Sequence, residues 1–224
     1  MKEMWKNTLI LFVITLIAGV SLSLVYSVTK EPIRKQEEAT KQKAYQAVFA
    51  DAEHFEEVED FDAEMATKLL HDANAGGYAD DEILMLATAF DAEGNVLGSV
   101  ITVTTHAGFG GDITFAMGMR EDGTLMGVSI TAISETPGLG MRASEVLAPQ
   151  FTEKQTDAPF TVTKTGSTYP FEIDAISSAT ITSQALTDAV NAGVAFLQAW
   201  TDYTTDPAMQ GGVELDMGGG AEYE

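Results

Sequence analysis

Residues 174–186, DAISSATITSQAL, place several hydroxyl side chains in a stretch that carries no charge after its first residue. The hydroxyl residues of this stretch are Ser177, Ser178, Thr180, Thr182 and Ser183. From Thr182 onward, apolar residues recur at three- and four-residue spacing as far as Trp200, which predicts an amphipathic helix. The first amides of a helix lack internal partners and carry the positive end of its dipole, so they attract anions. The stretch could therefore hold a phosphate through amides, through hydroxyls, or through a covalent bond to one hydroxyl, and the spacing does not choose among these.

A simpler role for the hydroxyls is helix capping. Thr182 or Ser183 could cap the predicted helix, which would stabilise it by about 1 kcal/mol. That role accounts for a single hydroxyl. It leaves the upstream hydroxyls of residues 177–180 unexplained, because they lie before the expected start of the helix.

Two glycine-containing segments precede this stretch. Residues 134–140, SETPGLG, contain Pro137 and two glycines, which by themselves predict a tight turn. Residues 106–113, HAGFGGDI, predict a glycine-rich bend between strands. The histidines of the chain are scattered without the spacing of metal ligands, so we expect no metal site at His54, His71 or His106.

Residues 174–180, D-A-I-S-S-A-T, resemble the flavinylation motif of the FMN-binding domain family, D-x-x-[S/T]-G-A-[S/T]. In that family a dedicated flavin transferase, which uses FAD and magnesium, joins the final Thr or Ser to the phosphate of FMN by a phosphoester. The resemblance implies that Thr180 carries covalent FMN and that Asp174 orients the motif or serves the transferase. The cofactor-binding residues implied in this segment are Asp174, Ser177, Ser178, Ala179 and Thr180.

The segment departs from the family motif at one position. Ser178 stands where glycine is usual. If glycine there serves close backbone approach, Ser178 could hinder the modification. Should Thr180 not be the acceptor, Thr182 is the next candidate.

The two glycine-containing segments resemble the same family. The loop at 134–140 is similar to the E-T-P-G-L-G loop of flavin-carrying membrane subunits, namely the G subunit of the Rnf electron-transport complex and the C subunit of the sodium-translocating NADH:quinone reductase. The G-F-G-G run within 106–113 resembles a strand-entry segment. The resemblance implies flavin contacts from Glu135, Thr136, Gly138, Leu139 and Gly140, with Leu139 packing on the isoalloxazine ring. Lys164, the one cation near the flavinylation motif in the sequence, could offset phosphate or ring charge, or be a solvated lysine at a strand end.

Together these resemblances imply a membrane-anchored flavoprotein in which FMN does the redox chemistry and no side chain is a catalytic acid or base. The short chain and its single anchor favour the Rnf-type subunit of a ferredoxin:NAD oxidoreductase coupled to ion translocation. The implied partners are other subunits of that complex, the flavin transferase during maturation, and membrane lipid. The alternatives are the quinone-reductase C subunit, a stand-alone extracytoplasmic electron carrier, and an anchored binding module without redox activity.

Residues 7–29 form an uncharged stretch of 23 residues that predicts a transmembrane anchor after a short tail at 1–6. A helix of that length spans about 35 Å, enough for the roughly 30 Å hydrocarbon layer of a membrane. A cleaved signal peptide is the alternative, although its apolar region is normally only about 7–15 residues. A count of basic residues would keep the body in the cytoplasm, whereas the family resemblance implies that the C-terminal domain is extracytoplasmic.

The rest of the chain predicts an α+β domain, in which an antiparallel sheet packs with helices. Residues 30–50 are rich in helix formers and predict a helical linker. Residues 51–81 are acidic and are expected to be mostly loop. Runs of β-branched residues around glycine-containing turns predict two hairpins, within 83–106 and 113–133.

Composition narrows the partners of this domain. The formal net charge is −22, from 12 basic and 34 acidic residues, so a phosphate backbone would be repelled and nucleic-acid binding is excluded. The predicted FMN-binding domain at 51–204 and a flexible, acidic, Gly-rich tail at 205–224 carry most of this negative charge. The absence of cysteine excludes disulfides and thiolate metal sites, and it suits an extracytoplasmic location.

Overall fold

The computed structural model describes residues 2–59, 61–75 and 77–205 of the chain. The chain separates into two compact units, residues 1–43 and 44–224. The predicted flexible tail lies outside the described residues, apart from Thr205.

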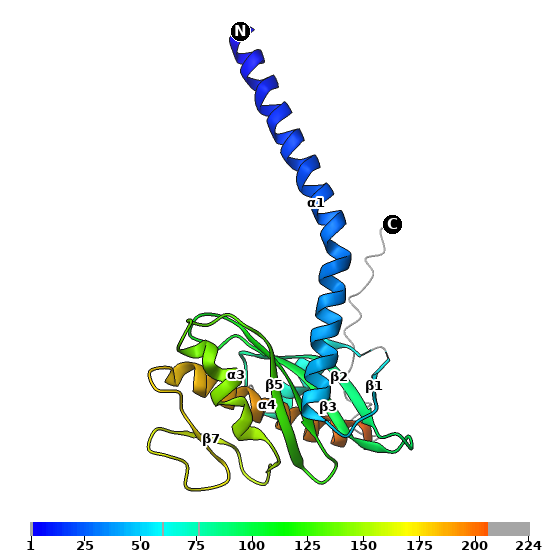
Figure 1. Cartoon of the computed structure of the whole chain (residues 1–224), viewed down its shortest axis with the longest axis vertical. Coiled ribbons are helices and arrows are strands. Elements are labelled where there is room, and N and C mark those ends of the chain that lie inside the picture. Colours follow the sequence, from blue (N-terminus) through cyan, green and yellow to red (C-terminus); the bar gives the residue numbers. More distant parts are fainter. Residues whose placement is uncertain (1, 60, 76, 206–224) are drawn as a thin grey trace, which may run out of the picture. The chain divides into compact units, whose positions relative to one another are not determined.

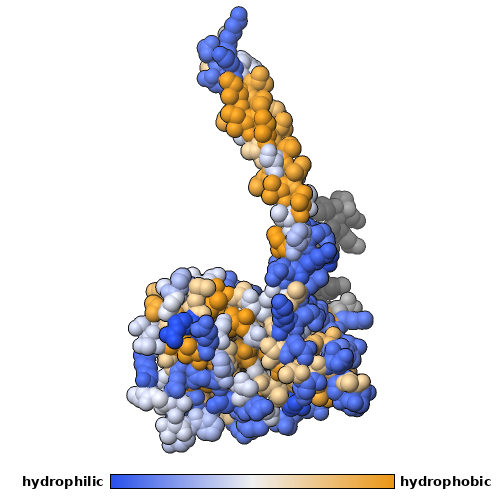
Figure 2. All heavy atoms as spheres, in the orientation of Figure 1, coloured by the Kyte–Doolittle hydropathy of each residue, from blue (hydrophilic) through white to orange (hydrophobic). Residues whose placement is uncertain are grey.

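Helix α1 (Lys2–Val48) contains the predicted anchor and most of the predicted linker without a break, and Pro32 lies inside it. The helix begins at Lys2, within the predicted tail. Among the described residues, α1 is the one helix that is long and apolar enough to cross a membrane. Figure 2 shows its apolar side chains as a band with polar residues at either end. This distribution matches a helix whose middle part lies in hydrocarbon and whose ends lie in water.

Residues 44–224 form an α+β unit on a six-stranded antiparallel sheet whose strands follow one another in sequence order (Figure 1). The strands are β1 (His54–Glu57), β2 (Asp81–Phe90), β3 (Val96–Thr105), β4 (Ile113–Met119), β5 (Thr124–Ile133) and β6 (Lys154–Gln155). Both predicted hairpins are confirmed, as β2 pairs with β3 and β4 pairs with β5. In the first turn the Asp91 carboxylate accepts the amides of Glu93 and Asn95 at 3.0 and 2.7 Å. These local bonds fix the turn and hence the register of the hairpin.

Apolar side chains cover both faces of this sheet. Helix α4 (Thr180–Thr205) packs on one face, where a Cβ at Gly193 would overlap the sulfur of Met117. Glycine at this position therefore allows the helix to approach the sheet closely. The core of the opposite face contains Val100 and four residues at the end of α1 and just after it, whereas the neighbour of Val100, Ile101, belongs to the α4 side. These four residues are Ala44, Tyr45, Val48 and Phe49. This alternation along β3 is the two-residue period of a strand that is buried on both faces.

The expectation that residues 51–81 are mostly loop is wrong. The segment contains β1 and helix α2 (Ala63–Ala73). The Asp62 carboxylate caps α2 by accepting two amides of its first turn, at 3.0 Å each. Ala66 and Leu70, one turn apart, bury the helix in the main core. The apolar stripe is only about two turns long and is surrounded by acidic residues, which is why the sequence pattern did not indicate it.

The remaining elements lie between β5 and α4 in the sequence. The first of them are three short helical turns, η1 (Gly140–Arg142), α3 (Ala143–Val146) and η2 (Ala148–Phe151). Strand β7 (Thr161–Thr163) pairs in parallel with β8 (Glu172–Asp174) in a separate two-stranded sheet. Helix α4 begins at Thr180, two residues before the predicted start.

The first residue of β2, Asp81, carries a buried carboxylate that is 4% exposed. Its Oδ1 has no hydrogen-bond partner among the described residues. Burial raises the pKa of the Asp81 carboxyl to about 6; the Thr105 hydroxyl opposes this shift, and the negative charge of Asp188 adds to it. The folded chain therefore holds a proton at Asp81 at a pH where the unfolded chain has released it.

Asp81→Asn is expected to stabilise the domain at pH 7–8 and to have little effect below about pH 4. The folded pKa lies above the unfolded value, so the stability contributed by the protonated form is lost as the pH rises through about 6. A rise from 3.8 to about 6 corresponds to about 3 kcal/mol, which is the upper bound of the gain. Urea unfolding of the detergent-solubilised chain between pH 4 and pH 8 measures the difference between variant and wild type. A difference that does not change with pH would contradict this assignment.

Candidate functional site

Three segments that are far apart in the sequence line one pocket of about 390 Å³. Its lining residues are Phe109, Glu135, Thr136, Leu139, Gly140, Ser178, Ala179, Thr180, Ile181 and Thr182. All of them except Phe109 and Ile181 were singled out from the sequence. The volume is in the range of pockets that bind small molecules and cofactors.

The candidate acceptor, Thr180, is the first residue of α4. The hydrogen bond that opens the helix runs from the Ser183 amide to the Ala179 carbonyl at 3.0 Å. The amides of residues 180–182 therefore precede the helical ladder and have no acceptor within the helix. No acidic side chain lies in the first turn. This end of α4 presents amides and the Thr180 hydroxyl at the pocket wall, an arrangement suited to an anion.

The sequence interpretation of Thr182 and Ser183 as helix caps is wrong. Both side chains are buried, and both residues lie within the first turn of α4 rather than before it. The Ser183 hydroxyl accepts a hydrogen bond from the Ile176 amide at 3.0 Å and donates one to the Ala179 carbonyl at 2.9 Å. It therefore fastens the loop before α4 to the helix and fixes the approach of the chain to Thr180.

A tight turn leads into α4. The Ala179 amide donates to the Ile176 carbonyl at 3.0 Å, and Ser178 has a φ of 65°. The residue before it, Ser177, has no positive φ, so the turn is of type II, with its third residue in the left-handed region. Glycine is favoured at that place, and a residue with a Cβ costs roughly 1–2 kcal/mol there. This gives a conformational reason for the glycine of the family motif, and it makes Ser178 a strained exception.

Glu135 joins the three segments of the pocket. Its side chain is buried, with 6% of the residue exposed. Its Oε1 accepts the Phe109 amide and the Thr182 hydroxyl, both at 2.8 Å, and its Oε2 accepts the Thr136 amide at 3.2 Å. Glu135 therefore holds the pocket together through three hydrogen bonds that it accepts.

Two glycines of the sequence motifs make room for this carboxylate. A Cβ at Gly140 would lie 2.7 Å from Glu135 Oε2 and 2.8 Å from Thr182 Oγ1. A Cβ at Gly110 would lie 2.8 Å from the Ser134 carbonyl oxygen and 3.2 Å from Glu135 Oε2. Any larger residue at Gly140 or Gly110 would push the backbone away from Glu135, so the glycine pattern follows from the position of this carboxylate.

Four of the residues expected at the site lie outside the pocket wall, namely Gly138, Lys164, Asp174 and Ser177. Gly138, Lys164 and Ser177 are exposed. Asp174 ends β8, and its amide and carbonyl bond to the Gln150 side chain at 2.7 and 3.1 Å. Its Oδ2 accepts the Ser167 hydroxyl at 3.3 Å, and its buried Oδ1 has no partner among the described residues. The backbone of Asp174 is therefore fixed, and the loop that leads to α4 starts from it.

Of the apolar part of the pocket wall, sequence reasoning identified Leu139 and missed Phe109 and Ile181. Phe109, Leu139 and Ile181 are 69%, 38% and 55% exposed, although large apolar side chains are usually buried. Their common feature in the sequence is that each stands beside glycines or hydroxyl residues rather than in an apolar run. The pocket therefore has an apolar wall next to the amides and hydroxyls at the start of α4. The apolar part suits a planar ring and the polar part suits a phosphate, so the residues present fit FMN.

The bend that carries Phe109 is also held at its base. His106 Nδ1 lies 2.8 Å from Asp112 Oδ1, and His106 Nε2 lies 3.4 Å from Glu82 Oε1. These two carboxylates raise the pKa of His106, with the hydrogen bond to Asp112 as the larger cause. The bend is thus tied to β2 at one end and to Glu135 at its tip.

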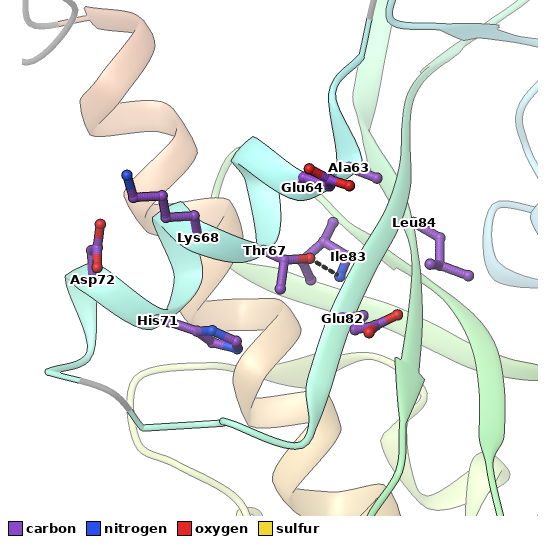
Figure 3. A pocket seen from close by; sticks show the side chains of 9 residues that line it. All are labelled: Ala63, Glu64, Thr67, Lys68, His71, Asp72, Glu82, Ile83 and Leu84. Atoms are coloured by element: carbon purple, nitrogen blue, oxygen red, sulfur yellow. Dashed lines mark hydrogen bonds between the residues drawn. The ribbon is translucent and has the colours of Figure 1, made fainter. Parts of the chain in front are cut away.

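A second hollow, of about 540 Å³, lies between α2 and β2. Figure 3 shows the Thr67 side chain accepting the Ile83 amide, a bond of 3.0 Å, on an edge of β2 that β1 does not cover. Charged side chains surround this contact, including Lys68, Asp72 and Glu82. The hollow contains no residue of the motif segments, and the Thr67 contact serves to cap the strand edge.

The sheet, its covering helix and the pocket at the start of that helix define an FMN-binding domain. The family model described as FMN-binding domain matches residues 108–195, which include all of the pocket lining. A second family model, described as RnfG N-terminal region, matches residues 1–48.

Components of ion-translocating complexes are similar to this chain over most of its length. The G subunit of the Na(+)-translocating ferredoxin:NAD(+) oxidoreductase complex of Acetobacterium woodii is 34% identical over 88% of the chain and 93% of that protein. The G subunit of the ion-translocating oxidoreductase complex of Methanosarcina acetivorans is 29% identical over 88% of the chain and 96% of that protein. The chain belongs to the family of Rnf-type G subunits of ion-translocating ferredoxin:NAD oxidoreductases, so the sequence-based recognition of this family is confirmed.

A solved structure supports the fold. The crystal structure of NqrC from Shewanella oneidensis matches with a TM-score of 0.50 and 17% identity, over 72% of this chain and 88% of that one. The predicted α+β class, with one long N-terminal apolar helix, is confirmed. The apolar helix and the membrane-complex relatives support a single-pass membrane protein.

Proposed function

We propose that this chain carries FMN covalently on Thr180, through a phosphoester, and relays electrons within an Rnf-type complex that couples ferredoxin and NAD to ion movement. The observation that carries the proposal is the single pocket in which the flavinylation segment, the 134–140 loop and the 106–113 bend meet. Thr180 stands there at the opening of a helix, where a bound phosphate gains both amides and the helix dipole.

The attachment is a phosphoryl transfer onto a hydroxyl. The Thr180 Oγ loses its proton and forms a bond to the FMN phosphorus of FAD, and the bond between the two phosphates of FAD breaks, so that AMP leaves. The flavin transferase and magnesium supply the base and the charge stabilisation for this step. This chain contributes the conformation of the acceptor loop. The Ser183 hydroxyl holds the loop by bonding to the Ile176 amide and the Ala179 carbonyl, so that the transferase meets Thr180 in a fixed position.

Once bound, FMN supplies one- and two-electron chemistry, and the side chains supply only position and environment. Phe109, Leu139 and Ile181 offer an apolar wall that excludes water from the ring. The Thr136 side chain is exposed at the same wall and can hydrogen-bond to the ring. Glu135 hydrogen-bonds to the 106–113 bend and to α4, and so links both to its own loop at 134–140. These bonds keep the apolar wall and the start of α4 at a fixed spacing.

Asp174 fits a motif-orienting role better than a cofactor contact, because Gln150 fixes its backbone and its side chain lies away from the pocket wall. Lys164 and Gly138 have no contact with the pocket, and we assign them no direct role. Residues 44–224 belong on the extracytoplasmic side in this proposal, since a covalent tether prevents cofactor loss where free FMN is scarce. The partners are the other subunits of the complex, the transferase during maturation, and lipid around α1.

A denaturing gel of the chain, co-expressed with a flavin transferase and viewed under ultraviolet light, tests the proposal. A fluorescent band at the mass of the chain is expected, because a phosphoester survives denaturation and a non-covalent cofactor does not. A band without fluorescence would favour the anchored binding module. Co-purification from native membranes then distinguishes an Rnf-type complex from a quinone reductase or a stand-alone carrier by the subunits that accompany the chain.

A further inference from the structure

Ser178 occupies a backbone position that favours glycine. Its φ of 65° places it in the left-handed region, as the third residue of the type II turn between Ile176 and Ala179. Among the described residues, the other non-glycine residues with positive φ are Ala75, Tyr78 and Glu153, and none of them lines the pocket. Strained residues that persist at a ligand site are frequently part of the function of that site.

The side chain that this strain places at the pocket is a hydroxyl. Ser178 lines the pocket together with Thr180, whereas its neighbour Ser177 does not. Among the described residues, no hydrogen bond to the Ser178 hydroxyl is formed, so the group is available to a ligand. Ser177 is equally exposed but does not line the pocket, so it serves as the control for loss of a serine hydroxyl in this loop.

The surroundings of Ser178 attract an anion. The amides of residues 180–182 precede the first helical hydrogen bond, and no acidic residue lies in the first turn of α4. Residues two apart in a chain have Cα atoms no more than about 7 Å from each other, so a phosphate on the Thr180 hydroxyl comes within reach of Ser178. The nearest acidic side chain in the pocket wall, Glu135, is already engaged by three donors.

We propose that the Ser178 hydroxyl donates a hydrogen bond to a phosphate oxygen of the FMN that is esterified to Thr180. Ser178 is then a positioning residue of the cofactor, and glycine at the same place would relax the turn but lose this bond. The inference rests on the proposed covalent attachment. It predicts that two properties change independently. The environment of the phosphate changes when the Ser178 hydroxyl is removed, and the stability of the turn changes when the Ser178 Cβ is removed.

Phosphorus NMR of the flavinylated full chain, in a detergent without phosphate, tests the first property. Ser178→Ala and Ser178→Gly are expected to move the single phosphoester resonance in the same direction and by similar amounts, because both remove the hydroxyl. Ser177→Ala is expected to leave the resonance at its wild-type position. Urea unfolding of the same chains, produced without the transferase, tests the second property. Ser178→Gly is expected to raise the midpoint, and Ser178→Ala to leave it unchanged.

An unchanged phosphorus resonance in Ser178→Ala would overturn the inference. A shift in Ser178→Gly alone would also overturn it, because such a shift would come from the changed backbone and not from the lost hydroxyl. An equal shift in Ser177→Ala would overturn it too. These failures differ from failure of the proposed function, in which the wild-type chain itself would have neither flavin nor a phosphoester resonance. If Ser178→Ala does not fold, an unchanged resonance in Ser178→Gly would still overturn the inference, because glycine also lacks the hydroxyl.

Discussion

Thr180→Ala is expected to remove the flavin from the chain completely. The substitution deletes the only atom to which the proposed phosphoester can be joined, while the helix start and the pocket wall remain, because alanine is a good helix former. Fluorescence of the denatured chain on a gel, and visible absorption after removal of small molecules, should both fall to the background of a chain expressed without the transferase. The fold should survive, since Thr180 is only half-buried and no hydrogen bond of its hydroxyl is needed within the described residues.

Thr180→Ser is the matched control for this experiment. It keeps a hydroxyl at the same position and is expected to retain covalent flavin, because serine is an alternative acceptor in the family motif. Fluorescence that persisted in Thr180→Ala would show that another hydroxyl is the acceptor. Thr182 would then be the first alternative to test, although it is buried and already donates to Glu135 at 2.8 Å.

Glu135→Ala is expected to destabilise the domain by roughly 3–5 kcal/mol. The substitution leaves the amides of Phe109 and Thr136 and the hydroxyl of Thr182 without their acceptor, and it opens a cavity where the side chain is buried. Each buried polar group without a partner costs about 1–3 kcal/mol. Urea unfolding of the chain without flavin measures the loss, and fluorescence of the flavinylated variant measures how much of the pocket remains usable.

Glu135→Gln keeps the shape of the side chain and removes part of its hydrogen bonding. With its oxygen at the place of Oε1, glutamine still accepts the Phe109 amide and the Thr182 hydroxyl, but its NH2 group then faces the Thr136 amide, which loses its acceptor. Its expected loss is about 1–2 kcal/mol, clearly smaller than that of Glu135→Ala. If alanine at this position were tolerated within about 0.5 kcal/mol, the assignment of Glu135 as the residue that joins the three segments would be wrong.

The elements that the sequence predicted well are those with strong local signals. The two hairpins have β-branched strands and turns that local side-chain bonds close, as Asp91 does in the first. The long apolar helix contains an uncharged run of 23 residues, and the amphipathic α4 has a clear apolar period over many turns. Helix α2 has neither advantage, because its buried face consists of Ala66 and Leu70 in a short acidic segment. Its stability comes from packing in the main core, which a local pattern does not reveal.

The site was predictable in part for the same reason. The three motif segments could be recognised locally, and the structure brings Phe109, Glu135 and Thr180, one residue from each, to one pocket. The role of Glu135 depends on Thr182, which is 47 residues away, and no local pattern indicates such a bond. The capping prediction for Thr182 failed because the helix starts earlier, where the Ala179 carbonyl receives the Ser183 amide. The strained turn at Ser178 likewise needs a measured backbone angle.

Mass analysis of peptides from the wild-type chain, purified from cells that contain a flavin transferase, tests the central claim most directly. The account predicts that the peptide containing Thr180 carries the added mass of FMN less one water, and that fragmentation places this mass on Thr180. The same peptide at its unmodified mass, from cells in which the transferase is active on another protein, would contradict the account.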